Sequence, residues 1–232
     1  MNQLIRLVRI TRRHGLRSTV ATIKEHLLYN FGGAYMRKYD PSKFELADAN
    51  PDKIYYVSPD EIQYFQPSLF ERFVDGFDRS ECPNPVVSGH WDRLRVSLED
   101  RVFYRSLERH FQEDVPWEET VFIQQCLDDV RADRSTWHRS SSEEDVFDRC
   151  AEVDNLYQSI KKEGFSTQET LGEEGAEITV NISRDGSLMQ SVNGKHRITI
   201  AKILQLDEVP VQIFARHKNC LDHKLNVNYE DK

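Results

Sequence analysis

Asn193-Gly-Lys-His-Arg197, followed by the apolar run from Ile198 to Leu206, is the stretch that decides the fold of this chain. Before it, apolar and polar residues alternate from Ile178 to Ser183, which predicts a strand with two unlike faces. Arg184-Asp-Gly186 predicts a turn and residues 187–192 a returning strand. The run itself predicts a helix that ends near Asp207, and residues 209–214 read as a closing strand.

The turn before this helix has the chemistry of an anion site. A glycine at position 194 lets the backbone approach a ligand closely, and the unpaired amides of a helix N-terminus favour an anion. Lys195, His196 and Arg197 add cationic donors, although the helix dipole disfavours cations at this end. A bound phosphate would remove that conflict, whereas the alternative is a hairpin followed by a helix with a basic start. We therefore predict phosphate contacts from these residues, namely Asn193, Gly194, Lys195, His196, Arg197 and Thr199.

Two segments resemble the ParB/sulfiredoxin superfamily. Asn193-Gly-Lys-His-Arg-Ile-Thr-Ile-Ala-Lys-Ile-Leu-Gln-Leu-Asp-Glu-Val-Pro-Val211 is similar to its Gly-x-x-Arg box, with the helix and strand that follow. Upstream, Leu156-Tyr-Gln-Ser-Ile-Lys-Lys-Glu-Gly-Phe-Ser-Thr-Gln168 resembles its "Leu-x-x-Ser-Ile-x-x-x-Gly-x-x-x-Gln" helix and turn. The match covers roughly a third of the chain and implies a nucleotide-binding domain.

The expected fold class is α+β: a small mixed-sheet ParB/sulfiredoxin-like domain with a helical insertion and an N-terminal helical segment. We divide the chain into a basic amphipathic helical segment (1–45), the ParB-like domain (46–65 plus 151–217), a mainly helical insertion (66–150) and a polar tail (218–232). Within the domain, residues 54–57 read as the first strand. Within the insertion, helices are predicted after Ser97 and Pro116, and Ser142 begins a third through a capping box.

The resemblance offers several functions. Partition proteins of the superfamily bind CTP and carry a helix-turn-helix DNA module, but this chain continues for only about 15 residues after the closing strand, so a DNA-partition CTPase is disfavoured. Sulfiredoxins have their reactive cysteine at the position of Lys195, which excludes that thiol chemistry. Free-serine kinases have Asp-Gly-x-His-Arg at the box and an essential Glu after the first strand. Here Glu61 occupies a similar place, and Asn193 departs from the Asp.

We therefore predict a ParB-like nucleotide-binding phosphotransferase, acting on a small-molecule or glycan hydroxyl, with Glu61 as general base and Asp60 as the near alternative. The cofactor would be ATP, ADP or CTP, with or without Mg²⁺, and the sequence names no metal ligand. The alternative is a non-catalytic, nucleotide-responsive binding module. If the protein is an enzyme, we expect the insertion to form one wall of a pocket over Lys195 to Arg197. If it is a binding module, we expect an exposed apolar patch on the insertion.

Charge is unevenly distributed along the chain. The whole carries −8, yet residues 1–39 hold eight Lys/Arg and one acid, Glu25, so this segment is +7 and the remainder −15. A basic amphipathic segment can lie on an anionic membrane surface, here through residues 1–30, or can dock on the acidic body of the same protein. We predict a cytoplasmic protein, because the four cysteines are scattered, no apolar run reaches ~18 residues and no signal peptide is evident. Peripheral association with a membrane is the alternative location. His110 and His138 lack ligand-like spacing and read as surface or helix-end residues.

Overall fold

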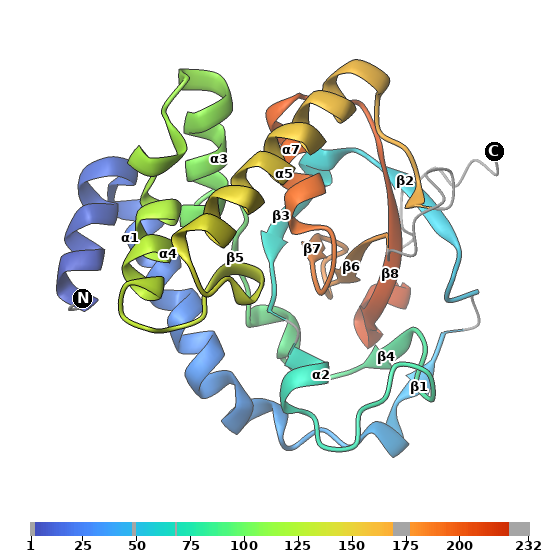
Figure 1. The fold of residues 1–232 in the computed structure, drawn as a ribbon. Helices are drawn as coiled ribbons and strands as arrows, with labels where there is room; N and C mark the ends of the chain where they lie inside the picture. The colour runs from blue at the N-terminus through green and yellow to red at the C-terminus, as the bar shows by residue number, and fades with distance from the viewer. Residues whose placement is uncertain (1–2, 48–49, 68, 169–176, 223–232) are drawn as a thin grey trace.

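A computed structural model describes residues 3–47, 50–67, 69–168 and 177–222 of the chain. Over these ranges the protein is α+β: helices pack beside a mixed sheet (Figure 1). The helices are α1 (Gln3–Met36), α2 (Leu69–Phe73), α3 (Val102–Glu113), α4 (Val121–Val130), α5 (Glu143–Glu163) and α7 (Lys195–Ile203). The strands are β1 (Glu45–Leu46), β2 (Ile54–Val57), β3 (Ile62–Phe65), β4 (Pro85–Val87), β5 (Val96–Ser97), β6 (Ile178–Ile182), β7 (Leu188–Gln190) and β8 (Val209–His217). Short 3-10 turns are η1 (Pro41–Lys43), η2 (Pro59–Glu61), η3 (Trp91–Arg93), η4 (Trp117–Glu119), η5 (Trp137–Arg139) and η6 (Lys218–Asp222).

The strand β8 organises the sheet. Within the described residues the strand order is β1-β4-β8-β6-β7-β3-β5, and β2 also pairs with β8. β2 runs antiparallel to β8, whereas β4 and β6 run parallel to it. The predicted strands at residues 54–57, 178–183 and 209–214 are thereby confirmed, with β2 and β6 each paired to β8. The antiparallel pairing of β6 with β7 places the turn after β7 beside the start of β6.

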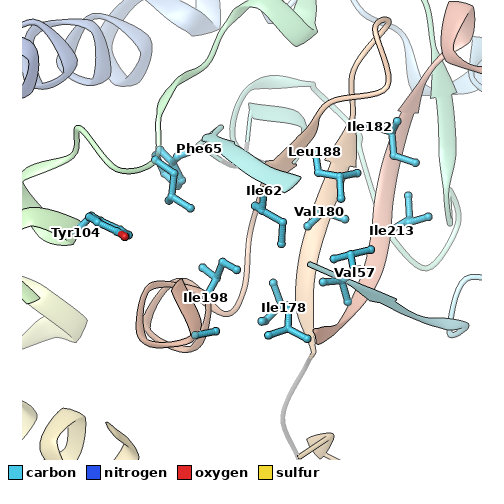
Figure 2. Packing of buried hydrophobic residues seen from close by; sticks show 14 of the residues in the cluster. Val57, Ile62, Phe65, Tyr104, Ile178, Val180, Ile182, Leu188, Ile198 and Ile213 are labelled. Atoms are coloured by element: carbon cyan, nitrogen blue, oxygen red, sulfur yellow. The ribbon is translucent and has the colours of Figure 1, made fainter. Parts of the chain in front are cut away.

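Both faces of β6 are buried. Ile178, Val180 and Ile182 face the apolar core that β6 shares with α7 (Figure 2). On the other face, the amide of Asn181 donates to Gln66 Oε1 at 2.7 Å and to Ser191 Oγ at 3.2 Å. A buried polar side chain is tolerated when it is hydrogen-bonded. The alternation of apolar and polar residues along β6 therefore separates an apolar core from a hydrogen-bonded polar interior, and neither face of the strand meets solvent.

Helix α7 lies between the sheet and a helical layer. Ile198 and Ala201 belong to the sheet-side core (Figure 2), whereas Ile200 and Ile203 pack into a second core with α3, α4 and α5. Ile198 and Ile200 are fully buried, and each such isoleucine contributes about 1.5–3 kcal/mol. Packing on two sides holds α7 rigidly and therefore fixes the position of its N-terminus.

The segment 66–150 contains helices α2, α3, α4 and the start of α5, and it also contributes strands. α3 and α4 cover the two predicted helices, and the Ser142 capping box begins α5. β4, however, pairs with β1 and β8, and β5 pairs with β3. These two strands were not predicted, because two or three residues are too few to show a period. The segment is thus built into the main sheet.

The N-terminal segment forms one helix, α1, that is kinked at Gly15, where φ is 79°. It docks on the rest of the protein, and its one acid, Glu25, makes a bidentate ion pair with Arg101, at 2.7 and 3.1 Å. Further ion pairs join Arg6 to Asp129 at 2.5 Å and Arg9 to Asp128 at 2.9 Å. The intramolecular alternative from the sequence is therefore what the structure shows for these side chains. No helix of the described residues has the length and apolar content to cross a membrane.

The predicted polar tail, residues 218–232, lies only partly within the residues that the structure describes. Residues 218–222 form the turn η6, and residues 223–232 lie outside the described residues. The four cysteines are all free and buried, in agreement with reduced thiols.

Candidate functional site

The turn between β7 and α7 requires a glycine. Gly194 has φ of 83°, and a Cβ there would lie 2.8 Å from the Cα of Ile178. The amide of Asn193 donates to Thr179 Oγ1 at 2.9 Å, and Gln190 Nε2 donates to the carbonyl oxygen of Asn193 at 3.1 Å. No side chain caps the N-terminus of α7. A tightly held turn thus presents an uncapped helix start, the local geometry that suits an anion.

This helix start opens into a cleft of about 810 Å³. The two segments that carry the family resemblance both line it: the turn Asn193–Arg197 on one side, and the end of α5 with residues 164–168 on the other. α1 contributes Tyr29. The segment 66–150 contributes four lining residues, which are Pro67, Arg72, Arg101 and His138. The remaining lining residues are Phe65, Asn155, Leu156, Ser159, Ile160, Glu163, Gly164, Phe165, Ser166, Gln168, Gln190, Ser191 and Val192.

Lys195 is a cation in this cleft with no counter-ion among the residues that the structure describes. Burial, and secondly the nearby Arg101 charge, lower the pKa of Lys195 to about 8. Its Nζ lies 5.1 Å from the ring centroid of Phe103, and no described carboxylate is within ion-pair distance of it. Burying a charge without a partner is unfavourable. An anion bound beside Lys195 would supply that partner and remove the unfavourable free energy.

Arg197 is held by a buried acid. Its Nη1 lies 3.4 Å from Oε2 of Glu177, which is only 4% exposed. Oε1 of the same carboxylate accepts a hydrogen bond from the backbone amide of Gln168 at 2.6 Å. Glu177 therefore joins the two resembling segments and orients the Arg197 guanidinium. The sequence analysis missed it, and its only signal is an acid directly before the apolar strand β6.

His196 is neutral and packed among rings. Burial, with the Lys195 charge as the second cause, lowers the pKa of His196 to about 3. The indole Nε1 of Trp137 donates to His196 Nε2 at 3.2 Å, so the imidazole proton is on Nδ1. His138 stacks on the same ring at 5.3 Å between centroids. His138 and Arg139 both have positive φ, and such strain often accompanies a functional site. His138 is exposed, as predicted for a surface residue, and it also lines the cleft.

The electrostatic balance of the cleft is cationic. Arg101 is 8% exposed, and its guanidinium carbon lies 3.6 Å from the Phe65 ring centroid while it pairs with Glu25. Together with Arg72, Lys195 and Arg197 it faces a cleft in which Glu163 is the one acid among the described lining residues. Clefts lined by one sign of charge concentrate ligands of the opposite sign.

Glu61 and Asp60 lie elsewhere. Glu61 Oε2 accepts from the backbone amide of Ser58 at 3.2 Å in a capping box, and Asp60 Oδ1 accepts from Lys202 Nζ at 3.3 Å. Lys202 is seven residues after Lys195, roughly 10 Å farther along α7. Neither acid lines the cleft, so the expectation that β2 delivers a base to the box does not hold in this structure.

Thr199 does not line the cleft. Its hydroxyl donates to the carbonyl oxygen of Lys195 at 2.8 Å, and the residue is 1% exposed. A hydroxyl satisfied inside the helix is not available to a phosphate. The structure therefore brings Asn193, Gly194, Lys195, His196 and Arg197 together at the cleft and leaves out Thr199, Asp60 and Glu61.

Comparisons of the chain with protein-family models, with curated proteins and with solved structures gave no match. Among the described residues, no group of three or more His, Cys, Asp or Glu is arranged to hold a metal ion. The functional argument therefore depends on the geometry of the cleft.

Proposed function

We propose that this cleft binds a nucleotide through its phosphates. The observation that carries the proposal is Lys195, a cation that has no counter-ion within the described part of the chain and lies beside the uncapped N-terminus of α7. Backbone amides at a helix start and a neighbouring lysine are the donors that proteins commonly use for phosphates. Arg197, oriented by Glu177, supplies a second cation at the same turn.

The rest of the cleft suits the remainder of a nucleotide. Its volume of about 810 Å³ lies in the range of small-molecule sites, roughly 300–1,000 Å³. Tyr29 and Phe165 line it and offer rings for a base, while Asn155 and Ser159 offer hydrogen-bond partners for a sugar. The described residues contain no metal-binding cluster, so Mg²⁺ would enter with the phosphates. ATP, ADP and CTP are the nucleotides to test first.

Titration calorimetry with these nucleotides, with and without Mg²⁺, tests the proposal. A charge-assisted contact contributes roughly 1.5–3 kcal/mol, so Arg197→Ala should weaken binding by about ten- to a hundredfold. Arg131→Ala is the matched control, since Arg131 is an exposed arginine after α4 whose side chain is 59% accessible and does not line the cleft. Equal loss in both variants would indicate a general charge effect and would contradict a specific phosphate site.

A phosphotransferase is the second candidate, and the cleft walls favour it. The segment 66–150 encloses the box with Arg72, Arg101 and His138, the arrangement expected of an enzyme. Its exposed large apolar side chain is Phe147 alone among the described residues, and a partner-binding patch would need more. With Glu61 outside the cleft, Glu163 takes the role of the carboxylate that accepts the acceptor's hydroxyl proton while the phosphoryl group leaves the nucleotide.

Turnover measurements separate the two candidates. Glu163→Gln should lower phosphoryl transfer by about 10²–10⁴-fold with nucleotide affinity changed only a few-fold. Glu61→Gln is the control and should leave the rate unchanged, because Glu61 is engaged in a capping box. If the unmodified protein binds nucleotide but turns over none of them, with or without metal, the non-catalytic nucleotide-responsive module is the function.

A further inference from the structure

Helix α1 carries an exposed apolar stripe. After the kink at Gly15, five large apolar side chains recur at spacings of three or four residues, which places them on one side of the helix. They are Leu16 (71% exposed), Val20 (45%), Ile23 (43%), Leu27 (47%) and Phe31 (66%). Most of the exposed large apolar residues in the described ranges lie on α1, which also includes Leu4, Ile5 and Val8.

The stripe lies opposite the face that docks on the protein. Ser18, Ala21 and Met36 are buried against the body, and Glu25 reaches Arg101 from the same side. Glu25 follows Leu16 by nine residues, which at 3.6 residues per turn is about half a turn around the helix. The stripe is therefore a separate outer face. At one edge, Leu16 and Val20 also line a shallow groove with Val96, Ser97 and Asp100 of the body.

Cations border this outer face. Arg6 and Arg9 are paired with acids of α4, so they serve docking. Arg17 and Lys24, by contrast, each follow a stripe residue, and neither has an ion pair with the described part of the chain. Of the eight Lys/Arg in the first 39 residues, two therefore attach α1 to α4 and two lie beside the stripe.

We propose that the outer face of α1 docks on an anionic membrane surface. An amphipathic helix with apolar residues flanked by Lys and Arg inserts its apolar side at the lipid interface while the cations meet anionic headgroups. The charge of −15 on residues 40–232 would be repelled by the same surface, which favours contact through α1 alone. A symmetric second copy fits less well, because it would bring two cationic borders together.

The proposal is independent of the nucleotide cleft. Tyr29, which lines the cleft, and Glu25, which holds Arg101, lie on the inner side of α1. Substitutions in the stripe should therefore change vesicle binding and leave nucleotide affinity as it is. If the membrane proposal fails, the nucleotide proposal still stands, and the reverse also holds.

Vesicle co-sedimentation of the full chain tests the docking surface. We expect binding to vesicles of equal parts phosphatidylglycerol and phosphatidylcholine at low salt, no binding to phosphatidylcholine alone, and release by salt. Leu16→Ser with Leu27→Ser should weaken binding by about tenfold or more. Arg17→Gln with Lys24→Gln should weaken it about thirtyfold, at roughly fivefold for each cation near the surface.

Exposed apolar side chains outside α1 provide the control for the stripe. Leu46→Ser with Phe147→Ser removes exposed apolar side chains elsewhere and should leave vesicle binding unchanged. Urea unfolding should give the same midpoint for the stripe variants, because those side chains are exposed. A protein that stays in the supernatant with anionic vesicles at low salt overturns the proposal. So does a dimer in analytical ultracentrifugation that Leu16→Ser with Leu27→Ser dissociates, since the stripe would then bind a second copy.

Discussion

Replacing Lys195 with methionine should stabilise the ligand-free protein. Burial is the main reason that the pKa of Lys195 falls from 10.5 to about 8, and the charge of Arg101 is the second. At 1.36 kcal/mol for each pKa unit, this fall corresponds to roughly 3 kcal/mol of unfavourable free energy in the folded protein at pH 7. Methionine has a similar length and no charge. We therefore expect Lys195→Met to raise the free energy of unfolding by about 1–3 kcal/mol.

The pH dependence gives the prediction a sign. Lys195 has a lower pKa in the folded than in the unfolded chain, so the unfolded chain binds more protons between about pH 8 and 10.5. The contribution of Lys195 to stability therefore improves as the pH rises through this window. The advantage of the methionine variant should be largest at pH 7 and should shrink towards pH 10.5. Urea unfolding followed by circular dichroism at pH 7, 9 and 10 measures it.

Lys202 provides the matched control on the same helix. Its Nζ lies 3.0 Å from Glu99, 3.3 Å from Asp60 and 3.1 Å from the carbonyl oxygen of Pro59. Lys202→Met leaves these acceptors without a donor and should destabilise the protein by about 1–3 kcal/mol. If Lys195→Met also destabilises at pH 7, Lys195 is a structural cation. The reasoning that it awaits an anionic ligand would then be refuted.

Three further changes test the framework around the cleft. Gly194→Ala should lower the free energy of unfolding by about 2–4 kcal/mol, because φ is positive and the new Cβ meets the backbone of Ile178; an unchanged urea midpoint would contradict the close approach. Glu25→Gln should cost about 3–5 kcal/mol by leaving the buried Arg101 without its bidentate partner, and a loss below about 1 kcal/mol would show that α1 is held mainly by apolar contacts. Burial, and secondly the Arg109 charge, lowers the pKa of His14 from 6.5 to about 4. Burial, and secondly the Lys195 charge, lowers the pKa of His196 from 6.5 to about 3. The unfolded chain then binds more protons below pH 6.5, so stability should fall as the pH drops from 6.5 to 4, and a flat unfolding midpoint over that range would refute it.

Local patterns were sufficient for most of the elements near the cleft. The alternation from Ile178 predicts β6, the serine capping box at Ser142 predicts the start of α5, and Gly15 marks the kink in α1. These features depend on residues a few positions apart, whose effects on backbone conformation act within one turn or one strand. The Gly194 turn was predictable for the same reason, since a glycine there serves the backbone directly.

Long-range packing decided which side chains share the site. Glu61 follows a correctly predicted strand, yet it caps a short turn at the far end of α7, whereas Glu177 binds Arg197 and was missed. The distinction between Lys195 and Lys202 is likewise invisible in the helix pattern, which places both on one polar face. Their surroundings come from other segments: Phe103 and Arg101 lie near the first, and Asp60 and Glu99 near the second. Charge balance at a buried site is a sum over neighbours that are distant in sequence, so only the folded arrangement of the chain specifies it.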